Sequence, residues 1–267
     1  MNFFRLDTHV HTRESSICGR TKGKIVADLY KKAGYDGIVI TDHYCKAYFQ
    51  KYAKNTSWED KIEHFLQGYY HVLEEGSKIG LTVMLGIEIK FTESPREFLI
   101  YGIDETFLKT YPELYNFGIV NFKQLTEEVA TSYEILIFQA HPFRPGVTPV
   151  SPKLIDGIEV YNGNPRHNSH NDQALAFAKN HNLLKISGSD FHRINDLGRG
   201  GIILPQEINS SQELVSFFKE KKEEIKLITT LYTPFSILRF FTILFNQIRN
   251  LIRIKKPTSS TKCDPSD

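Results

Sequence analysis

The sequence predicts an α/β fold in which about seven strand–helix units form a barrel. Three observations support this fold class. Short runs rich in Ile, Val, Leu and Phe recur along the chain, stretches with apolar residues at helical spacing separate many of them, and glycines mark several junctions. With 267 residues, 40% of them hydrophobic and 24% charged, the chain can bury a sizeable core as one domain with or without an extension.

The expected elements alternate between strand and helix, which predicts a mainly parallel sheet because parallel neighbours need a long crossover connection. Apolar and β-branched runs predict strands at residues 3–6, 38–40, 81–85, 98–101, 135–138, 157–160, 183–186 and 201–204. Apolar residues at helical spacing predict helices at residues 25–33, 58–73, 125–130, 172–180 and 212–219. We therefore expect residues 1–230 to form one domain.

The last part of the chain differs in composition from the rest. Pro234 interrupts the chain, and residues 231–256 combine large apolar side chains at helical spacing with several arginines and lysines. This pattern predicts a basic amphipathic helix, which would either lie on a membrane surface or pack on the barrel or on a second subunit. Residues 257–267 are rich in Ser, Thr and Pro and are expected to form a disordered tail.

Bulk composition argues against several functional classes. The formal net charge is +2 and basic residues gather in the tail, so we expect no stable nucleic-acid binding. Cys18, Cys45 and Cys263 lie far apart without a CxxC pair, which argues against a disulfide framework and a cysteine-only zinc knuckle. Because the N-terminus lacks the basic start and apolar run of a signal peptide, we expect a cytoplasmic protein, with peripheral membrane attachment through the basic helix as an alternative.

A His-x-His motif follows the first expected strand, in the segment Asp7-Thr8-His9-Val10-His11. Residues i and i+2 of a strand point to the same side, so His9 and His11 can share one metal ion. Asp7 can orient one of the imidazoles from behind. A polar strand end with two unrelated histidines is the alternative for this motif taken alone.

Four more polar motifs stand where expected strands end, and strand C-termini form the active-site face of β/α barrels. They are Thr41-Asp42-His43, Gly86-Ile87-Glu88, Ala140-His141-Pro142-Phe143-Arg144 and Ser189-Asp190-Phe191-His192. Glu88 can bridge two cations, and Asp190 and His192 share one side of the chain. Arg144 either holds phosphate oxygens in a fork or is a surface residue. Chance explains five such motifs at strand ends poorly, so the set predicts a centre for divalent cations.

In this order the motifs resemble those of the PHP (polymerase and histidinol phosphatase) superfamily, over residues 3–204. The resemblance implies a distorted (β/α)7 barrel with two or three divalent metal ions, usually Zn, Mn or Fe. It also implies that Glu88 bridges the first two ions. The ligands so implied are His9, His11, Glu88 and Asp190 for the first ion, Glu88 and His141 for the second, and His43 and His192 for the third.

Two positions depart from the common pattern of that superfamily. Glu97 stands where many members have a histidine ligand, and a carboxylate can take that role. The third ion usually takes a His or Asp shortly after the His-x-His motif. Glu14 and Cys18 are the ligand-type side chains in that stretch, and we favour Glu14 as the ligand of an oxygen-rich site.

The implied activity is hydrolysis of a phosphoester in a phosphorylated small molecule, either a phosphomonoester or a nucleotide or phosphodiester. Clustered cations lower the pKa of a bound water to about 7, and the metal-bridging hydroxide would attack phosphorus while the cations and Arg144 neutralise its oxygens. Asp190 or His192 would protonate the leaving oxygen. Three alternatives stay open: a histidinol-phosphatase-like enzyme, another metal-dependent amidohydrolase, and a non-catalytic metal-binding regulatory module.

Overall fold

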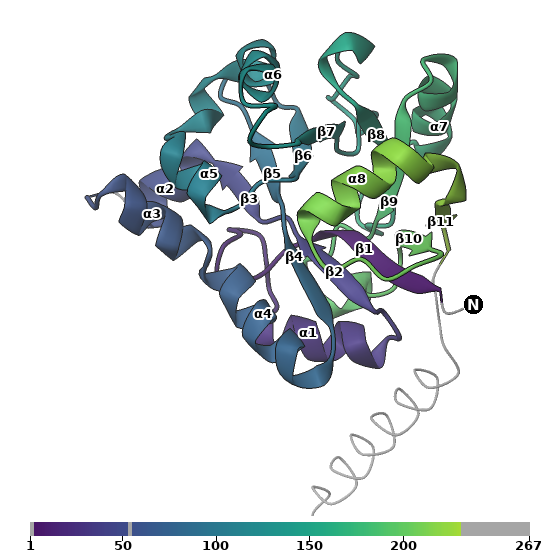
Figure 1. Ribbon diagram of the computed structural model, residues 1–267, viewed down its shortest axis with the longest axis horizontal. Helices are drawn as coiled ribbons and strands as arrows, with labels where there is room; N and C mark the ends of the chain where they lie inside the picture. Colours follow the sequence, from purple (N-terminus) through teal and green to yellow (C-terminus); the bar gives the residue numbers. More distant parts are fainter. Residues whose placement is uncertain (1–2, 53–54, 231–267) are drawn as a thin grey trace, which may run out of the picture. The chain divides into compact units, whose positions relative to one another are not determined.

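The computed structural model describes residues 3–52 and 55–230, so the helix expected at 231–256 and the tail expected at 257–267 lie outside the described residues. The protein has a mixed α/β fold whose strands pair in two sheets (Figure 1). The first sheet contains, in spatial order, β11 (Lys226–Ile228), β10 (Gly201–Leu204), β1 (Phe4–Val10), β2 (Gly37–Ile40) and β4 (Thr82–Leu85). The second contains β3 (His43–Cys45), β5 (Ile87–Lys90), β6 (Glu97–Tyr101), β7 (Leu136–Gln139), β8 (Gly157–Asn162) and β9 (Leu184–Gly188).

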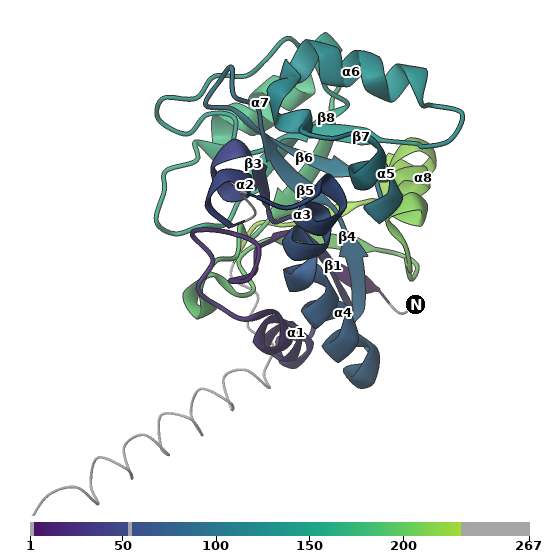
Figure 2. The ribbon, with the colours of Figure 1, turned by 90° about the vertical axis from the view of Figure 1, so that its left-hand side faces the viewer.

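Helices cover the outer faces of these sheets. α1 and α4 lie side by side (Figure 2), and they approach closely because a Cβ atom on Gly23 would lie only 2.8 Å from the carbonyl oxygen of Gly68. α7 packs on β8, and α8 packs on β6. The α-helices are α1 (Gly23–Lys32), α2 (Lys46–Tyr52), α3 (Trp58–Phe65), α4 (Gln67–Ile79), α5 (Glu105–Thr110), α6 (Gly118–Glu128), α7 (Asn171–Asn180) and α8 (Ser211–Lys221).

Among the described strands, five pairs are parallel and four are antiparallel, so the sheets are mixed. β6 runs antiparallel to both β5 and β7, and β10 runs antiparallel to both β1 and β11. Residues 91–96 alone connect β5 to β6, and so short a link joins antiparallel strands because a parallel crossover needs a dozen residues or more. The apolar pattern identifies these segments as strands but carries no information on their direction.

Two strands of the first sheet lead directly into strands of the second. β2 continues as β3 just after Asp42, and β4 continues as β5 just after Gly86. The amide of Glu88 donates to the carbonyl of Asp42 at 3.1 Å, so the two bent strands stay joined. On the other side, β1 meets the segment after β9 through a bridge between Val10 and Phe191. The described strands thus pair as two adjoining sheets, and the closed barrel stays a prediction.

The helix expected at 58–73 is two helices, α3 and α4, which meet at Leu66. The amide of Gly68, in the first turn of α4, donates to Ser15 Oγ at 3.0 Å. A Cβ atom on Gly68 would lie 1.9 Å from Thr12 Oγ1, so only glycine permits this approach. The break therefore lets α4 pack against the loop that follows β1.

Apolar side chains fix the sheets against the helices. One cluster, which includes Tyr44, Phe65 and Phe122, packs the second sheet against α2, α3 and α6. A second cluster, which includes Leu6 and Phe218, joins β1 to α8. These rigid layers hold the strand ends that carry the polar motifs. In the part of the chain that the structure describes, every helix is too short or too polar to span a bilayer.

Candidate metal centre

β1 ends on two buried histidines that share one side of the strand, as the His-x-His spacing predicts. The ring centroids of His9 and His11 are 4.9 Å apart. His9 Nδ1 lies 2.9 Å from Glu159 Oε1, and His11 Nδ1 lies 3.2 Å from Ser16 Oγ. The Nε2 atoms of both rings are buried and have no hydrogen-bond partner among the described residues. An imidazole that donates from Nδ1 presents a free lone pair at Nε2, which is the form that binds a metal ion.

Glu88 lies at the middle of the histidines. Its Oε1 atom is 3.4 Å from His9 Nε2 and 3.0 Å from His141 Nε2. Its Oε2 atom is 3.4 Å from His11 Nε2 and 2.7 Å from His43 Nδ1. The side chain is fully buried, and a buried carboxylate needs nearby positive charge to offset its desolvation. Its two oxygens face different histidines, which is the arrangement that a carboxylate bridging two cations requires.

A second group of ligand-type atoms contains Glu88, Glu97 and His141, whose oxygen and nitrogen atoms all lie within 4.8 Å of one another. Glu97 Oε2 is 3.5 Å from His141 Nε2. Glu97 begins β6 and pairs with Lys90 at the end of β5, so the hairpin brings its carboxylate beside Glu88. The structure therefore places the Glu97 carboxylate next to Glu88 and His141.

Asp190 completes the first group, with His9 and His11. Its Oδ1 atom is 3.4 Å from His11 Nε2, while its Oδ2 atom accepts hydrogen bonds from Arg144 and from Asn164 Nδ2, the latter at 3.2 Å. The backbone of Asp190 is left-handed, with φ of 51°, a conformation that aspartate tolerates better than most residues. One oxygen thus faces the histidines, and the other is held by side chains of the pocket wall.

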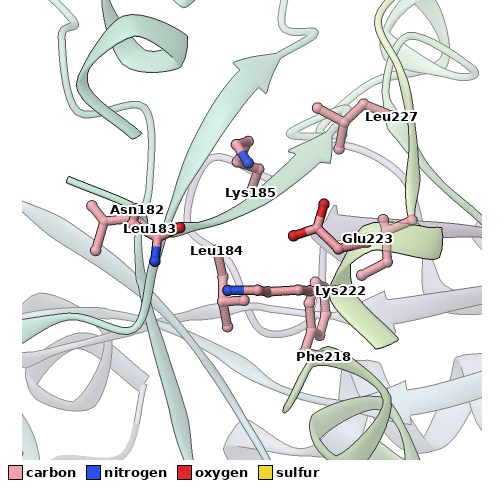
Figure 3. A pocket seen from close by; sticks show the side chains of 9 residues that line it. Asn182, Leu183, Leu184, Lys185, Phe218, Lys222, Glu223 and Leu227 are labelled. Atoms are coloured by element: carbon pink, nitrogen blue, oxygen red, sulfur yellow. The ribbon is translucent and has the colours of Figure 1, made fainter. Parts of the chain in front are cut away.

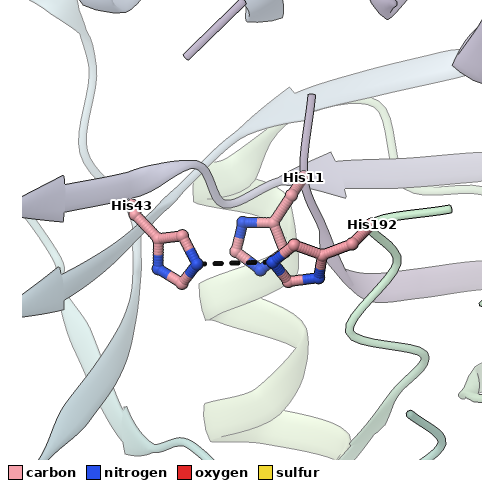
Figure 4. A group of neighbouring side chains, drawn as sticks. All are labelled: His11, His43 and His192. Atoms are coloured by element: carbon pink, nitrogen blue, oxygen red, sulfur yellow. Dashed lines mark hydrogen bonds between the residues drawn. The ribbon is translucent and has the colours of Figure 1, made fainter. Parts of the chain in front are cut away.

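His11, His43 and His192 form a third group, and Figure 4 shows their rings gathered together. The ring centroid of His11 is 4.4 Å from that of His43 and 4.2 Å from that of His192. The Nε2 atoms of His43 and His192 are 3.4 Å apart. Two imidazole nitrogens at this distance need a proton or a cation between them, since two lone pairs would repel.

The structure does not bring Glu14, the expected ligand of the third ion, into the group of His11, His43 and His192. Its carboxylate accepts hydrogen bonds from the amide of Gly23 at 3.1 and 3.2 Å and lies 3.2 Å from His71 Nδ1, so it fixes the start of α1 instead. Cys18, the other candidate, reaches the third group: its Sγ atom lies 3.0 Å from His192 Nε2. The fold of the loop after β1 determines which of Glu14 and Cys18 lies next to the third group. The spacing of these residues in the sequence does not contain that information.

The carboxylate that orients an imidazole is Glu159 rather than Asp7. Asp7 accepts hydrogen bonds from the amides of His9 and Ser189 and from the Tyr30 hydroxyl, so it joins strand ends. Glu159, on β8, holds His9 Nδ1 through Oε1 and accepts from the amide of His141 through Oε2. Glu159 is a lone glutamate inside the apolar run 157–160, and this pattern is the sequence signal for a buried polar role, which the motifs at the strand ends do not include.

The role of Glu159 predicts an effect on metal affinity without loss of a ligand. Glu159→Gln weakens the acceptor for His9 Nδ1, so we expect metal affinity to fall about 10- to 100-fold. Metal titrations followed by mass spectrometry would measure this change. Glu134→Gln, at a carboxylate 54% exposed and paired with Lys219, is the matched control and should leave affinity unchanged. Equal affinity in the two variants would contradict the assignment.

The buried charges at the centre stabilise one another. Burial alone would raise the pKa of Glu88, but His43 and His9 hold it well below its ordinary value. Burial would lower the pKa of His9, but Glu159 and Glu88 raise it well above the ordinary value. Burial and the neighbouring His192 and His43 lower the pKa of His11. The neutral form of His11, which is the form that can bind a metal ion, is therefore favoured in the metal-free protein.

The thiol of Cys18 is expected to ionise unusually easily in metal-free protein. Burial would raise its pKa, but hydrogen bonds with His192 and His43 outweigh burial and lower the pKa from 9.0 to about 6. The thiolate is the nucleophile, so a lowered pKa extends reactivity toward lower pH. We expect the rate of iodoacetamide alkylation, followed by mass spectrometry of the Cys18 peptide, to be half-maximal near pH 6. A midpoint near pH 9 would exclude this environment.

A pocket with a volume of about 410 Å3 opens above the centre. Arg144 lines it, with its guanidinium held by Asp190 and by Asn162 Oδ1 at 3.2 Å. The Nε atom of Arg144 is buried and has no hydrogen-bond partner among the described residues. The lining residues are Cys18, His43, Glu97, His141, Arg144, Asn164, Arg166, His167, Asp190, His192 and Arg193. A cavity with several cationic side chains beside a cluster of ligands suits an anion.

A second cavity, of about 130 Å3, lies beside β9, α8 and β11, away from the histidines (Figure 3). Its polar side chains include Lys185, Lys222 and Glu223, and its other walls are mainly apolar. Histidine and cysteine are absent from its described lining, so the ligand chemistry belongs to the larger pocket.

Comparisons with known proteins found one family match and several similar folds. Residues 168–222 match the PHP-associated family. The fold is similar to that of a two-domain protein from Bacteroides vulgatus that contains a predicted PHP-like metal-dependent phosphoesterase, with TM-score 0.61, 17% identity and 86% of this chain covered. This chain spans 65% of the length of that protein. No curated protein matches the chain.

The fold is also similar to that of PsfC from Pseudomonas syringae, with TM-score 0.60 and 17% identity, over 94% of this chain and 100% of PsfC. At these identities the solved structures establish a shared fold. The three groups of His, Asp and Glu side chains described above could each hold a metal ion. The match to the PHP-associated family covers residues 168–222, and the similarity to the two solved structures is one of fold.

Proposed function

We propose that this protein is a metal-dependent phosphoesterase that acts on a phosphorylated small molecule, either a phosphomonoester or a nucleotide or phosphodiester. One observation carries the proposal. The buried Nε2 atoms of His9 and His11 have no hydrogen-bond partner among the described residues, and they converge with Glu88 and Asp190 beneath a pocket lined by Arg144. Unpaired buried nitrogens beside buried carboxylates are a costly arrangement that a divalent cation satisfies.

The donor set fits two or three divalent ions such as Zn, Mn or Fe. When bound, they would supply Lewis-acid stabilisation of phosphate oxygens and a water of lowered pKa. Imidazole and carboxylate ligands suit all three metals. The residues that would hold the ions are His9, His11, Glu88 and Asp190 for the first, Glu88, Glu97 and His141 for the second, and His43 and His192 for the third.

Side chains of the pocket would position the phosphate of the substrate and protonate its leaving oxygen. Arg144 is locked by Asp190 and Asn162, so its guanidinium faces a phosphate without losing side-chain entropy on binding. His192 lines the same pocket, and its Nδ1 atom lies 3.2 Å from Asp190 Oδ1. His192 or Asp190 would give a proton to the leaving oxygen, and our proposal keeps both candidates.

Three further expectations belong to the same proposal. The two adjoining sheets would act as one distorted barrel whose strand ends face the pocket. The protein would be cytoplasmic and would form no stable nucleic-acid complex. Residues 231–256 would provide peripheral membrane attachment or self-association.

Phosphate release from a panel of phosphoesters tests the proposal. Metal-stripped protein is expected to be inactive, and protein refilled with Mn or Zn is expected to release phosphate. The double variant His9→Ala, His11→Ala should stay inactive in both conditions because the first site loses both of its imidazoles. If the refilled protein binds metal tightly but hydrolyses none of the panel, the phosphoesterase proposal fails, and another hydrolase chemistry or a metal-binding regulatory module replaces it.

A further inference from the structure

The loop between β1 and α1 carries a cysteine to the rim of the pocket. Cys18 Sγ lies 3.0 Å from His192 Nε2, and the thiol also contacts His43. Cys18, His43 and His192 line the same pocket. One sulfur and two imidazole nitrogens therefore lie close together at the wall of this pocket.

Backbone hydrogen bonds hold this loop on both sides of Cys18. The amide of Gly19 donates to the carbonyl of Ser16 at 3.0 Å, and the amide of Arg20 donates to the carbonyl of His192 at 2.9 Å. A Cβ atom on Gly19 would lie 2.1 Å from the carbonyl oxygen of Thr12, so the loop can fold back this tightly only with glycine there. The position of the thiol is thus set by the backbone.

Buried polar contacts fix the base of the same loop. Asp42 Oδ1 accepts from the amide of Thr12 at 2.7 Å and from Ser16 Oγ at 2.6 Å, and the amide of His43 donates to Ser16 Oγ at 3.0 Å. Asp42, Thr12 and Ser16 are all buried. A network of this kind keeps Cys18 and His43 at a constant separation, as a preorganised metal site needs.

The imidazoles around Cys18 point to a ligand at this place. The rings of His43 and His192 pack against that of His11, and the three residues form a group whose ligand-type atoms all lie within 4.8 Å of one another. The Nε2 atoms of His43 and His192 face each other at 3.4 Å. A cation bound by His43 Nε2, His192 Nε2 and the Cys18 thiolate would give each of the two nitrogens a partner and would remove the repulsion between their lone pairs.

We propose that the Cys18 thiolate is the third protein ligand of the site formed with His43 and His192, and that this sulfur makes the site selective for a thiophilic divalent cation such as Zn²⁺. Thiolate favours Zn²⁺ over Mn²⁺, whereas the carboxylate-rich group of Glu88, Glu97 and His141 accepts harder cations. Binding forms one metal–sulfur bond and releases the thiol proton to solvent. The inference rests on the proposed metal centre.

X-ray absorption at the zinc edge of the full-length, zinc-loaded protein tests this proposal. We expect a sulfur shell at about 2.3 Å, the length of a zinc–sulfur bond. Cys18→Ser should abolish the shell and lower zinc affinity by more than about tenfold, without changing manganese affinity. Cys45→Ser is the matched control, a free cysteine of the described chain that lines a different pocket, and it should keep the shell. Cys18→His should keep the zinc and lose the shell.

Each outcome decides one point. Zinc bound by nitrogen and oxygen alone in the wild-type protein overturns the inference and leaves the phosphoesterase proposal standing. A sulfur shell that survives Cys18→Ser also overturns it. Failure of the wild-type protein to bind either zinc or manganese removes the metal centre itself, and the proposed function with it. Circular dichroism of each variant would show that a lost shell does not reflect a lost fold.

Discussion

Glu88→Gln is expected to lower kcat/KM for phosphoester hydrolysis by at least about 10³-fold, or about 4 kcal/mol in transition-state stabilisation. Glu88 is the buried carboxylate whose oxygens face four histidines, at 2.7 to 3.4 Å. The amide of glutamine is neutral and places a donor where a cation should bind, so both adjoining sites lose affinity. Metal content by mass spectrometry and phosphate release on the same preparation would measure the two effects together.

Glu14→Gln provides the matched control for that experiment. Glu14 also follows β1 and is also close to a histidine, but its carboxylate lies against Gly23 and His71 rather than at the centre. This variant should keep wild-type metal content and activity. A loss of metal in Glu14→Gln as large as that in Glu88→Gln would mean that the loop after β1 folds differently from the structure described above.

Arg144→Ala is expected to lower kcat/KM about 10²-fold, or about 3 kcal/mol, while leaving metal content unchanged. Arg144 is the cationic side chain of the pocket that contacts Asp190, and its Nε atom has no described hydrogen-bond partner. Asp190 keeps Asn164 as a donor when the guanidinium is removed, so its other oxygen should still face the histidines. Steady-state kinetics with metal analysis would separate a loss of charge stabilisation from a loss of the metal ions.

Two further variants sharpen this test. Arg144→Lys keeps the charge but not the planar fork, so we expect activity between those of wild type and Arg144→Ala. Arg199→Ala removes an arginine that donates to the carbonyl of Asn195 and does not line the pocket, and it should be fully active. If Arg144→Ala loses metal in proportion to activity, Arg144 acts through Asp190 and does not bind the phosphate.

Local sequence patterns were sufficient to predict most strands and the clustering of the polar motifs. The runs expected at 38–40, 98–101, 157–160 and 201–204 are strands within a residue or two of the expected bounds. Strand periodicity is local, because alternate side chains must share a face whatever the strand pairs with. The same rule placed His9 beside His11 before any fold was known.

Strand direction and helix continuity depended on contacts between distant segments. β6 is antiparallel because the link from β5 is short, and α3 ends at Leu66 beside Gly68, which packs against Ser15 and Thr12. Helical periodicity continues through the break, since apolar spacing reports burial and not the partner. These features therefore had to come from the structure.

The sequence by itself determined which residues could hold cations. Possible metal ligands can be recognised in the His-x-His motif, in the strand-end glutamate, and in the pair Asp190 and His192. Only the tertiary structure decided which of them meet. It placed Cys18 beside His192, turned Glu14 toward Gly23, and brought Glu159 of β8 to the imidazole of His9. The physical reason is that a metal site depends on distances of a few ångströms between segments far apart in sequence, and loop folding and strand pairing set those distances.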